Sequence, residues 1–244
     1  MHGPGQWLAA LFALWLAIGA AAAQQPEPMP APPAPAVMPG PRPPAHRIVL
    51  SEVVDPRYRE AVLAVARKPT LASRAAYPEF VGTSAFYDWL LDHPDRVSMA
   101  WQRRKVPCVA ISDRGNGTFS WDDGEGSMLT WQTVGRFADG LVWYATGKVK
   151  ASAITPSVPV KAVVVMVHPK KTLGNGTVSI TPMAQVYLQT DSKAAKIVLK
   201  LLGPSAPQLA EQGVEQLLFF FAGIAQYAQK HPDKSDALLA PARK

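Results

Sequence analysis

The sequence predicts an α+β domain with two short helices near its N-terminus, an antiparallel meander sheet of about six strands and a long C-terminal helix. Two observations indicate this order. Between residues 109 and 189, β-branched and aromatic residues dominate and are separated by glycine-containing turn pairs, the pattern of an antiparallel sheet. After Pro207 the chain runs to Lys230 without another proline and has an apolar centre, which indicates one long helix.

Two short helices are predicted before the sheet. Residues 55–67 place apolar side chains at the three- and four-residue spacing of an amphipathic helix, and Asp55–Pro56 is typical of an N-cap followed by a first turn. The second helix is predicted to begin at the Thr83–Ser84 cap and to end at His93–Pro94, because a residue before proline disfavours the helical conformation.

The strands of the meander are separated by dipeptides that supply positive φ angles in tight hairpin turns. Strands are predicted over residues 109–113, 118–122, 128–137, 141–150, 161–168 and 178–189. The turn pairs are Asn116–Gly117, Asp123–Gly124, Asp139–Gly140 and Asn175–Gly176. A weak first strand is expected at residues 47–53, and a loop at residues 151–159 interrupts the meander.

The C-terminal helix is predicted over residues 207–230. Its centre, residues 217–225, is apolar nearly all round, so it requires cover on more than one face. A stretch of this length is too short to span a membrane. Residues 233–244 are expected to form a disordered polar tail.

The N-terminal residues have the features of an export signal. Residues 7–23 are apolar and uncharged and end in three alanines, which predicts cleavage after Ala23. The positive charge ahead of them comes only from the α-amino group and His2, so an uncleaved anchor stays open. Residues 24–45 contain ten prolines and predict a disordered tether before a folded domain at 46–232. We therefore expect an exported protein, periplasmic or extracellular.

Charge and cysteine content exclude some classes of partner. The formal net charge is +7, but the basic residues are scattered along the sequence. This scatter and the predicted export both argue against a nucleic-acid partner. A weak contact with an anionic membrane surface, or a basic surface that only keeps the domain soluble, explains the charge. The single cysteine, Cys108, is expected to be a small buried apolar residue rather than a nucleophile.

No motif for catalysis, metal binding or a cofactor stands out. Three of the histidines, His93, His168 and His231, precede proline, which predicts surface or capping roles. The acidic group around Asp122–Asp123 lacks the distal glutamate of a calcium loop. Its Asp–Gly pair is typical of a hairpin turn. We expect no catalytic residue, no metal ligand and no cofactor. An enzyme is the weaker option, favoured only if Tyr144, Tyr187 or Asp139 points into a cavity.

Two segments resemble parts of a known superfamily. Residues 84–95, SAFYDWLLDHPD, resemble the aromatic helix and proline turn of the START-like (SRPBCC) superfamily. Residues 185–190, then 201–204 and the helix from Pro207, resemble its last strand and closing helix. The resemblance covers residues 54–231. It implies the helix-grip fold, a sheet curled around the C-terminal helix with an apolar cavity that in relatives binds lipids, sterols, polyketides and hormones.

The expected function is therefore that of an exported protein that holds an apolar ligand, such as a lipid, a sterol-like molecule or an isoprenoid, between sheet and helix. The alternative is an exported protein-interaction or cell-envelope structural module with a solid core and no ligand. The side chains expected to contact the ligand are Trp131, Trp143, Tyr187, Phe220, Ile224 and Tyr227.

Overall fold

The computed structural model describes residues 48–150, 157–174, 177–190 and 206–241. The predicted signal, the tether and the Asn175–Gly176 turn lie outside these residues. Within them, the elements in chain order are α2 (Leu50–Val53), α3 (Pro56–Arg67), β1 (Leu71–Ala76), β2 (Phe80–Gly82), α4 (Ser84–Asp92), α5 (Pro94–Arg103), β3 (Ile111–Gly115), β4 (Thr118–Asp122), β5 (Met128–Phe137), β6 (Gly140–Val149), β7 (Val158–Val167), β8 (Lys170–Thr172), β9 (Val178–Ile180), β10 (Met183–Thr190), α7 (Ala206–Lys230) and α8 (Pro232–Leu239).

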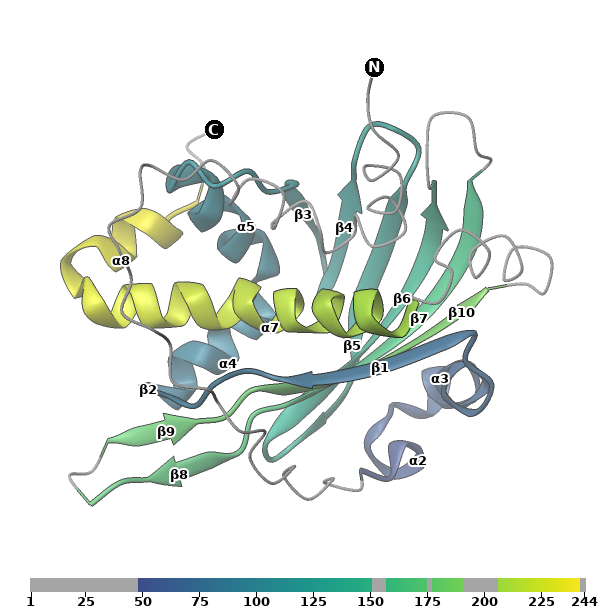
Figure 1. The fold of residues 1–244 in the computed structure, drawn as a ribbon, viewed down its shortest axis with the longest axis horizontal. Helices are drawn as coiled ribbons and strands as arrows, with labels where there is room; N and C mark the ends of the chain where they lie inside the picture. Colours follow the sequence, from purple (N-terminus) through teal and green to yellow (C-terminus); the bar gives the residue numbers. More distant parts are fainter. Residues whose placement is uncertain (1–47, 151–156, 175–176, 191–205, 242–244) are drawn as a thin grey trace.

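A large antiparallel sheet forms the centre of the molecule (Figure 1). In the described residues it has seven strands in the order β1-β10-β7-β6-β5-β4-β3. The strands from β3 to β7 follow one another as a meander, and β1 pairs with β10, so that the first strand of the sheet lies beside the last. A second sheet of three short strands, β2-β9-β8, extends beyond one end of the large sheet (Figure 1). The predicted α+β class, with a large antiparallel sheet and a C-terminal helix, is confirmed.

The hairpin turns follow the predicted chemistry where they are described. Asn116 and Gly117 have φ angles of 53° and 68°, the left-handed conformation that a two-residue turn between β3 and β4 requires. Asp139 and Gly140 connect β5 to β6, whose strands pair from Phe137 and Gly140 outward. The β4 and β5 strands have the predicted bounds.

Two predictions for the N-terminal part are wrong. The expected strand at residues 47–53 is instead the short helix α2, and the first strand is β1, Leu71–Ala76. The sequence of β1 is rich in alanine and has no strand signature. It pairs with β10 along its whole length. These backbone hydrogen bonds stabilise a strand whose side chains have low strand propensity. The predicted second helix is found as α4, which ends at Asp92 as expected, but a further helix that was not predicted, α5, begins at Pro94, where proline occupies the first turn.

Two further differences concern the C-terminal half. The strand expected at residues 178–189 is divided at Thr181–Pro182 into β9, which joins the small sheet, and β10, which joins the large one. The residues expected to form a disordered tail contain α8, whose Leu238 is buried against the core. This contact explains why a polar segment is ordered.

Helices cover the two faces of the large sheet with different side chains. On the outer face, α2 and α3 lie over a cluster formed largely by valines. Asp55 caps α3 by accepting a hydrogen bond from the Arg57 backbone nitrogen at 2.9 Å, and hydrogen bonds from Arg57 lower the pKa of Asp55 to about 2. On the inner face lies α7, and α4, α5 and α8 surround its C-terminal half (Figure 1).

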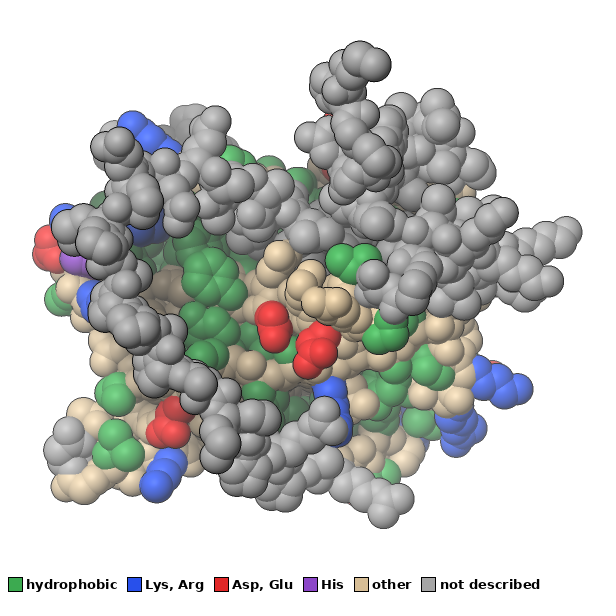
Figure 2. Space-filling view, in the orientation of Figure 1, with side chains coloured by type: hydrophobic (Ala, Val, Ile, Leu, Met, Phe, Trp, Pro, Cys, Tyr) green, Lys and Arg blue, Asp and Glu red, His purple; other side chains and the backbone are tan. Residues whose placement is uncertain are grey.

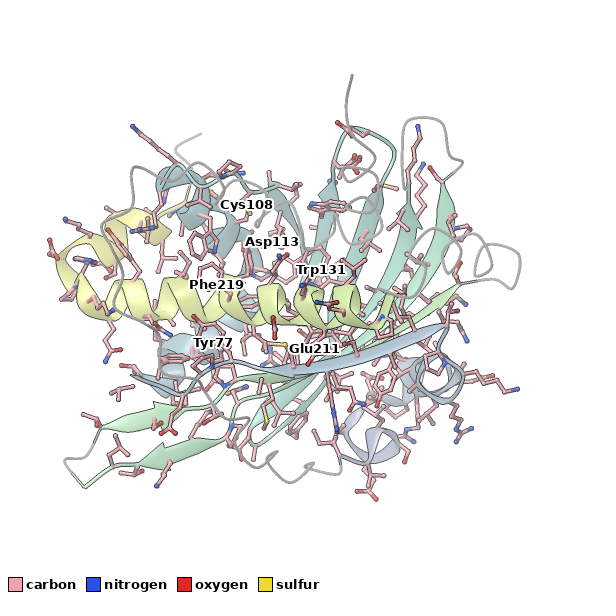
Figure 3. The ribbon with its side chains drawn as sticks, viewed as in Figure 1. Tyr77, Cys108, Asp113, Trp131, Glu211 and Phe219 are labelled. Carbon is pink, nitrogen blue, oxygen red and sulfur yellow. The ribbon has the colours of Figure 1, made fainter. Side chains whose placement is uncertain are left out.

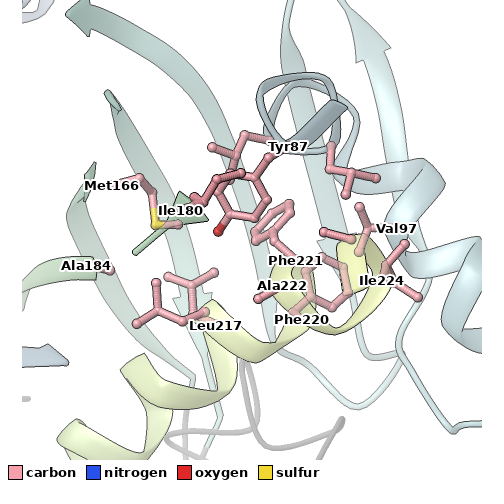
Figure 4. Packing of buried hydrophobic residues seen from close by; sticks show 14 of the residues in the cluster. Tyr87, Val97, Met166, Ile180, Ala184, Leu217, Phe220, Phe221, Ala222 and Ile224 are labelled. Atoms are coloured by element: carbon pink, nitrogen blue, oxygen red, sulfur yellow. The ribbon is translucent and has the colours of Figure 1, made fainter. Parts of the chain in front are cut away.

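The inner core is the larger and more aromatic of the two. Figure 4 shows Phe220, Phe221 and Ile224 of α7 packed among side chains of α4, α5 and the sheet. As expected from its composition, α7 is buried on most of its circumference in this region, although Phe219 keeps 39% of its surface exposed. Among the described residues, no helix is long and apolar enough to cross a membrane.

Candidate functional site on the inner face of the sheet

The backbone of the long helix α7 lies closest to one edge of the large sheet, and its Phe221 side chain reaches Trp143 on the central strand β6. Its main backbone contacts with the large sheet are to β1 and β10, at one edge. On its other flank, Leu209 packs against the apolar side chains of β4, β5 and β7. Gln216 and Phe220 follow Leu209 at intervals of seven and four residues, so they lie on the same side of the helix. This flank therefore faces the β3–β5 half of the sheet.

We call this surface the β5 flank and define it by three residues of α7 and three of the sheet. They are Leu209, Gln216 and Phe220, with Ile111, Phe119 and Trp131. The sheet members lie on one face because Ile111 pairs with Trp121, Phe119 pairs with Trp131, and alternate residues of a strand share a face.

Trp131 is the central side chain of the β5 flank. It is half-buried and packs against both inner clusters, the large one around α7 and a second one around Trp121 and Leu129. Its ring lies 5.9 Å from that of Phe119. In Figure 3, Cys108 and Asp113 lie on one side of α7 and Tyr77 on the other, with Trp131 near the first half of the helix. Trp131 thus offers a partly exposed aromatic surface between two apolar clusters.

One polar group lies in these apolar surroundings without a partner. The Oε1 atom of Gln216 is buried and has no hydrogen-bond partner among the described residues. A buried amide oxygen left unpaired costs about 1 to 3 kcal/mol. A molecule bound along the β5 flank would remove this cost if it donated a hydrogen bond to Gln216.

Three of the six predicted ligand-binding residues come together in the large inner cluster. Trp143, Phe220 and Ile224 are buried there, and the Trp143 ring lies 5.7 Å from that of Phe221. Trp131 packs against the same cluster from the β5 flank. The indole nitrogen of Trp101 donates to the carbonyl of Phe220 at 2.9 Å, which ties α5 to α7 beside these side chains.

Of the other two predicted residues, Tyr187 lies on the opposite face, and Tyr227 packs against the edge of the same inner cluster. Tyr187 is on the outer face, where it packs with the cluster under α3, because odd-numbered residues of β10 point away from α7. Tyr227 packs at the far end of α7, with the guanidinium carbon of Arg104 3.6 Å from its ring centroid. Tyr144 also belongs to the outer cluster, and the Asp139 carbonyl in the β5–β6 turn accepts from the His168 backbone nitrogen.

The structure also brings together polar residues that sequence reasoning missed. His168 is only 3% exposed, so the predicted surface role is wrong for this histidine. Its Nε2 atom lies 2.6 Å from Oδ1 of Asp88 on α4, and the ammonium of Lys170 lies 2.9 Å from Oδ2 of the same carboxylate. Tyr87, the neighbour of Asp88, is fully buried, and its ring lies 5.5 Å from that of His168.

The charge state of this group follows from its surroundings. Burial lowers the pKa of His168, although the hydrogen bond that its imidazole donates to Asp88 opposes the shift. Burial raises the pKa of Asp88, but the hydrogen bonds from Lys170 and His168 outweigh it, so the net pKa is lowered. A neutral His168 beside an ionised Asp88 must carry its proton on Nε2, since a carboxylate can only accept. Its Nδ1 atom is then an acceptor.

The other sequence candidates have structural roles in the described residues. Asp122 and Asp123 accept backbone hydrogen bonds from Gly124 and Ser127 at 2.8 and 2.9 Å, which holds the β4–β5 turn. Burial raises the pKa of the Cys108 thiol, as expected for an apolar residue. No group of three or more His, Cys, Asp or Glu side chains in the described part of the chain is placed to hold a metal ion.

The surface around α7 is mixed in character. Figure 2 shows hydrophobic side chains beside the helix and acidic side chains over it. Phe219 is exposed on α7, and its ring lies 6.2 Å from that of Tyr77 and 5.2 Å from that of Trp101. Glu211 and Glu215 are exposed on the same helix.

Comparisons with known proteins do not assign a family. No protein-family description and no curated protein matches the chain. Similar solved structures include a conserved protein from Geobacillus kaustophilus, with 16% identity and a TM-score of 0.34 over 66% of this chain and 97% of that one. Another is an uncharacterized protein from Rhizobium leguminosarum, with 12% identity and a TM-score of 0.33 over 63% and 97%. Similarity at this level carries no argument about function.

Proposed function

We propose that this protein is an exported START-like domain that binds an apolar ligand, such as a lipid, a sterol-like molecule or an isoprenoid, along the β5 flank. The observation that carries the proposal is the off-centre position of α7. It lies along the β1–β10 edge and leaves Trp131 half-buried between two apolar clusters, beside the unpartnered Oε1 of Gln216. An apolar surface with a few convergent polar groups is the usual composition of a small-molecule site.

The element order supports a fold of the helix-grip type. One strand, β1, and two helices, α4 and α5, precede a meander that ends in a strand paired with β1, and the long helix α7 follows. Of the segments that resemble the START-like superfamily, residues 84–95 fall on α4 and the start of α5, residues 185–190 fall within β10, and residues 201–204 lie outside the described residues. In this fold a ligand would lie between sheet and closing helix, the side on which Trp143, Phe220 and Ile224 are buried.

Burial would supply the affinity. A ligand that transfers about 400 Å² of apolar surface from water gains about 10 kcal/mol before the entropic cost of association. Little charge is needed for this mode of binding, and the six residues that define the β5 flank are uncharged, with Asp113 opposite Phe119 as a charged neighbour on the same face. The weak attraction of the basic surface to anionic lipid would serve delivery or uptake rather than affinity.

The proposal is tested by native mass spectrometry of the mature protein purified from its own export compartment, followed by solvent extraction. We expect a bound apolar molecule of one copy per chain. Trp131→Ala should reduce its occupancy at least tenfold, since the ring would lose its contact with the ligand. Trp89→Ala is the matched control, because Trp89 is also half-buried but stacks on His93 of the α4–α5 junction.

A second candidate is the interaction or cell-envelope module. The exposed Phe219 beside the half-buried Tyr77 favours it, because a solvent-facing aromatic patch is typical of protein-binding surfaces. An empty mass, with no uptake from a panel of fatty alcohols, sterols and isoprenoids, would overturn the ligand proposal and leave this candidate.

A further inference from the structure

Tyr87 places a hydroxyl group inside the inner core. Its side chain is fully buried on α4, and its hydroxyl has no hydrogen-bond partner among the described residues. Figure 4 shows this hydroxyl directed toward the side chains of Met166 and Leu217, between the sheet and α7. Burial raises the pKa of Tyr87 well above its usual value, so the group stays protonated and can donate.

His168 places an unpartnered acceptor in the same region. It follows Met166 by two residues, so its side chain is on the inner face of the sheet. Its Nε2 atom is engaged by Asp88, and its Nδ1 atom is buried with no partner among the described residues. The edge-to-face contact with Tyr87, 5.5 Å between ring centroids, packs the two rings that carry these unpartnered atoms against each other.

We propose that the Tyr87 hydroxyl and His168 Nδ1 form the polar end of the ligand site and bind a hydroxyl group at the terminus of the apolar ligand. The inference rests on the proposed binding function and names the ligand class, an apolar alcohol. Tyr87 and Trp143 belong to the cluster that Trp131 packs against, so in this proposal the apolar part of the ligand lies toward Trp131 and its hydroxyl toward α4.

A hydroxyl group matches this pair better than other polar termini. It accepts a hydrogen bond from Tyr87 and donates one to His168 Nδ1, which satisfies both atoms. A carboxylate would place its charge against the acceptor Nδ1, and an ether or ester can only accept. Asp88 therefore acts as a positioning residue, because its carboxylate fixes the proton of His168 on Nε2 and leaves Nδ1 free.

The test uses three probes that share one chain, dodecan-1-ol, its methyl ether and dodecane, titrated into the mature protein with tryptophan fluorescence as the readout. The alcohol can make both hydrogen bonds, the ether one and the alkane none. We expect the dissociation constant to rise about tenfold at each step. In Tyr87→Phe the ether and the alkane should bind alike. In His168→Phe the alcohol and the ether should bind alike, while dodecane keeps its affinity in both variants.

The outcomes separate the two proposals. If the three probes bind the wild-type protein with equal affinity, or if the ether keeps its advantage over the alkane in Tyr87→Phe, the hydroxyl site is overturned and the apolar site stands. If none of the probes binds and no apolar molecule co-purifies, both fail.

Nitrogen NMR of the imidazole provides a measurement that needs no ligand. We expect His168 to show the neutral tautomer with its proton on Nε2, and this preference to weaken in Asp88→Asn. A proton on Nδ1 would make that atom a donor and would overturn the proposed pairing.

Discussion

The two faces of the large sheet are packed in different ways. On the outer face, α2 and α3 rest on a layer that is mostly valine, including Val62 and Val163, and these side chains are fully buried. On the inner face, buried aromatic side chains such as Trp143 and Phe221 are packed among aliphatic ones, and the apolar residues form two clusters joined by the half-buried Trp131.

Unpaired polar groups show the same difference. Within the described residues, the inner side has Tyr87, His168 and Gln216 with buried polar atoms that lack partners, whereas α3 on the outer side has only Arg59 Nε. Natural proteins satisfy most buried polar groups, so a concentration of unpaired ones indicates a site rather than a packing layer. The outer face therefore has the character of a packing layer, and the inner face is the one on which we propose that the ligand binds.

The largest effect is expected from truncating the inner core. Phe221→Ala should reduce the free energy of unfolding by about 3 to 5 kcal/mol, since the ring packs against Phe220 and Trp143. Val62→Ala on the outer face should cost about 2 kcal/mol, because it removes two methyl groups. Denaturant unfolding of both variants measures the difference, and an equal cost would contradict the distinction between the faces.

A close contact between the backbones of α2 and β5 allows the packing of the outer face to be tested. A Cβ atom added at Gly135 would lie 2.5 Å from the Val53 carbonyl oxygen, where α2 meets the bulge in β5. Gly135→Ala should therefore destabilise the protein by about 1 to 3 kcal/mol. Gly174→Ala is the control, because nothing lies within 4 Å of its added Cβ. If both variants unfold at the same denaturant concentration, α2 is not held against β5.

Removing an unpaired hydroxyl should have a smaller effect of opposite sign. Tyr87→Phe should raise the free energy of unfolding of the ligand-free protein by about 1 kcal/mol, because an unpaired buried hydroxyl is costly. The same change should weaken the binding of an apolar alcohol. Thermal unfolding with and without dodecan-1-ol measures both, and a loss of stability in the ligand-free protein would show that the hydroxyl has a partner.

The smallest effect is a pH dependence from His168. Burial lowers its pKa below the unfolded value of 6.5, so the unfolded chain binds the proton more readily. Stability is therefore highest above that value and falls as the pH drops from 6.5 toward the pKa of His168 in the folded protein. The charges of Asp88 and Asp139 raise this folded pKa, and that of Lys170 lowers it, without reversing the effect of burial. Denaturation midpoints between about pH 8 and 5 should fall less in His168→Gln than in the wild-type protein. Parallel curves would exclude His168 as the source.

Local chemistry allowed much of the fold to be predicted. Three features were predicted from short sequence patterns and are found in the structure: the cap at Asp55, the Asn116–Gly117 turn and the apolar centre of α7. The edge strand β1 could not be predicted, because its six residues carry no strand signature and depend on β10, which lies more than a hundred residues away.

The site was less accessible to prediction. Trp143, Phe220 and Ile224 were expected together from their apolar character, but Tyr187 lies on the opposite face because the strand register was not known. The pairing of His168 with Asp88 joins residues 80 positions apart, so no spacing in the sequence reveals it. The position of His168 two residues after Met166 in an alternating strand was the only signal.

The central claim, that the inner face binds an apolar ligand, is tested most directly by fluorine NMR of the protein labelled with 5-fluorotryptophan, each signal being assigned by a Trp→Phe variant. We predict that dodecan-1-ol shifts the signals of Trp131 and Trp143 and leaves that of Trp89, which stacks on His93, in place. A spectrum that does not change, or in which only Trp89 moves, would contradict the account.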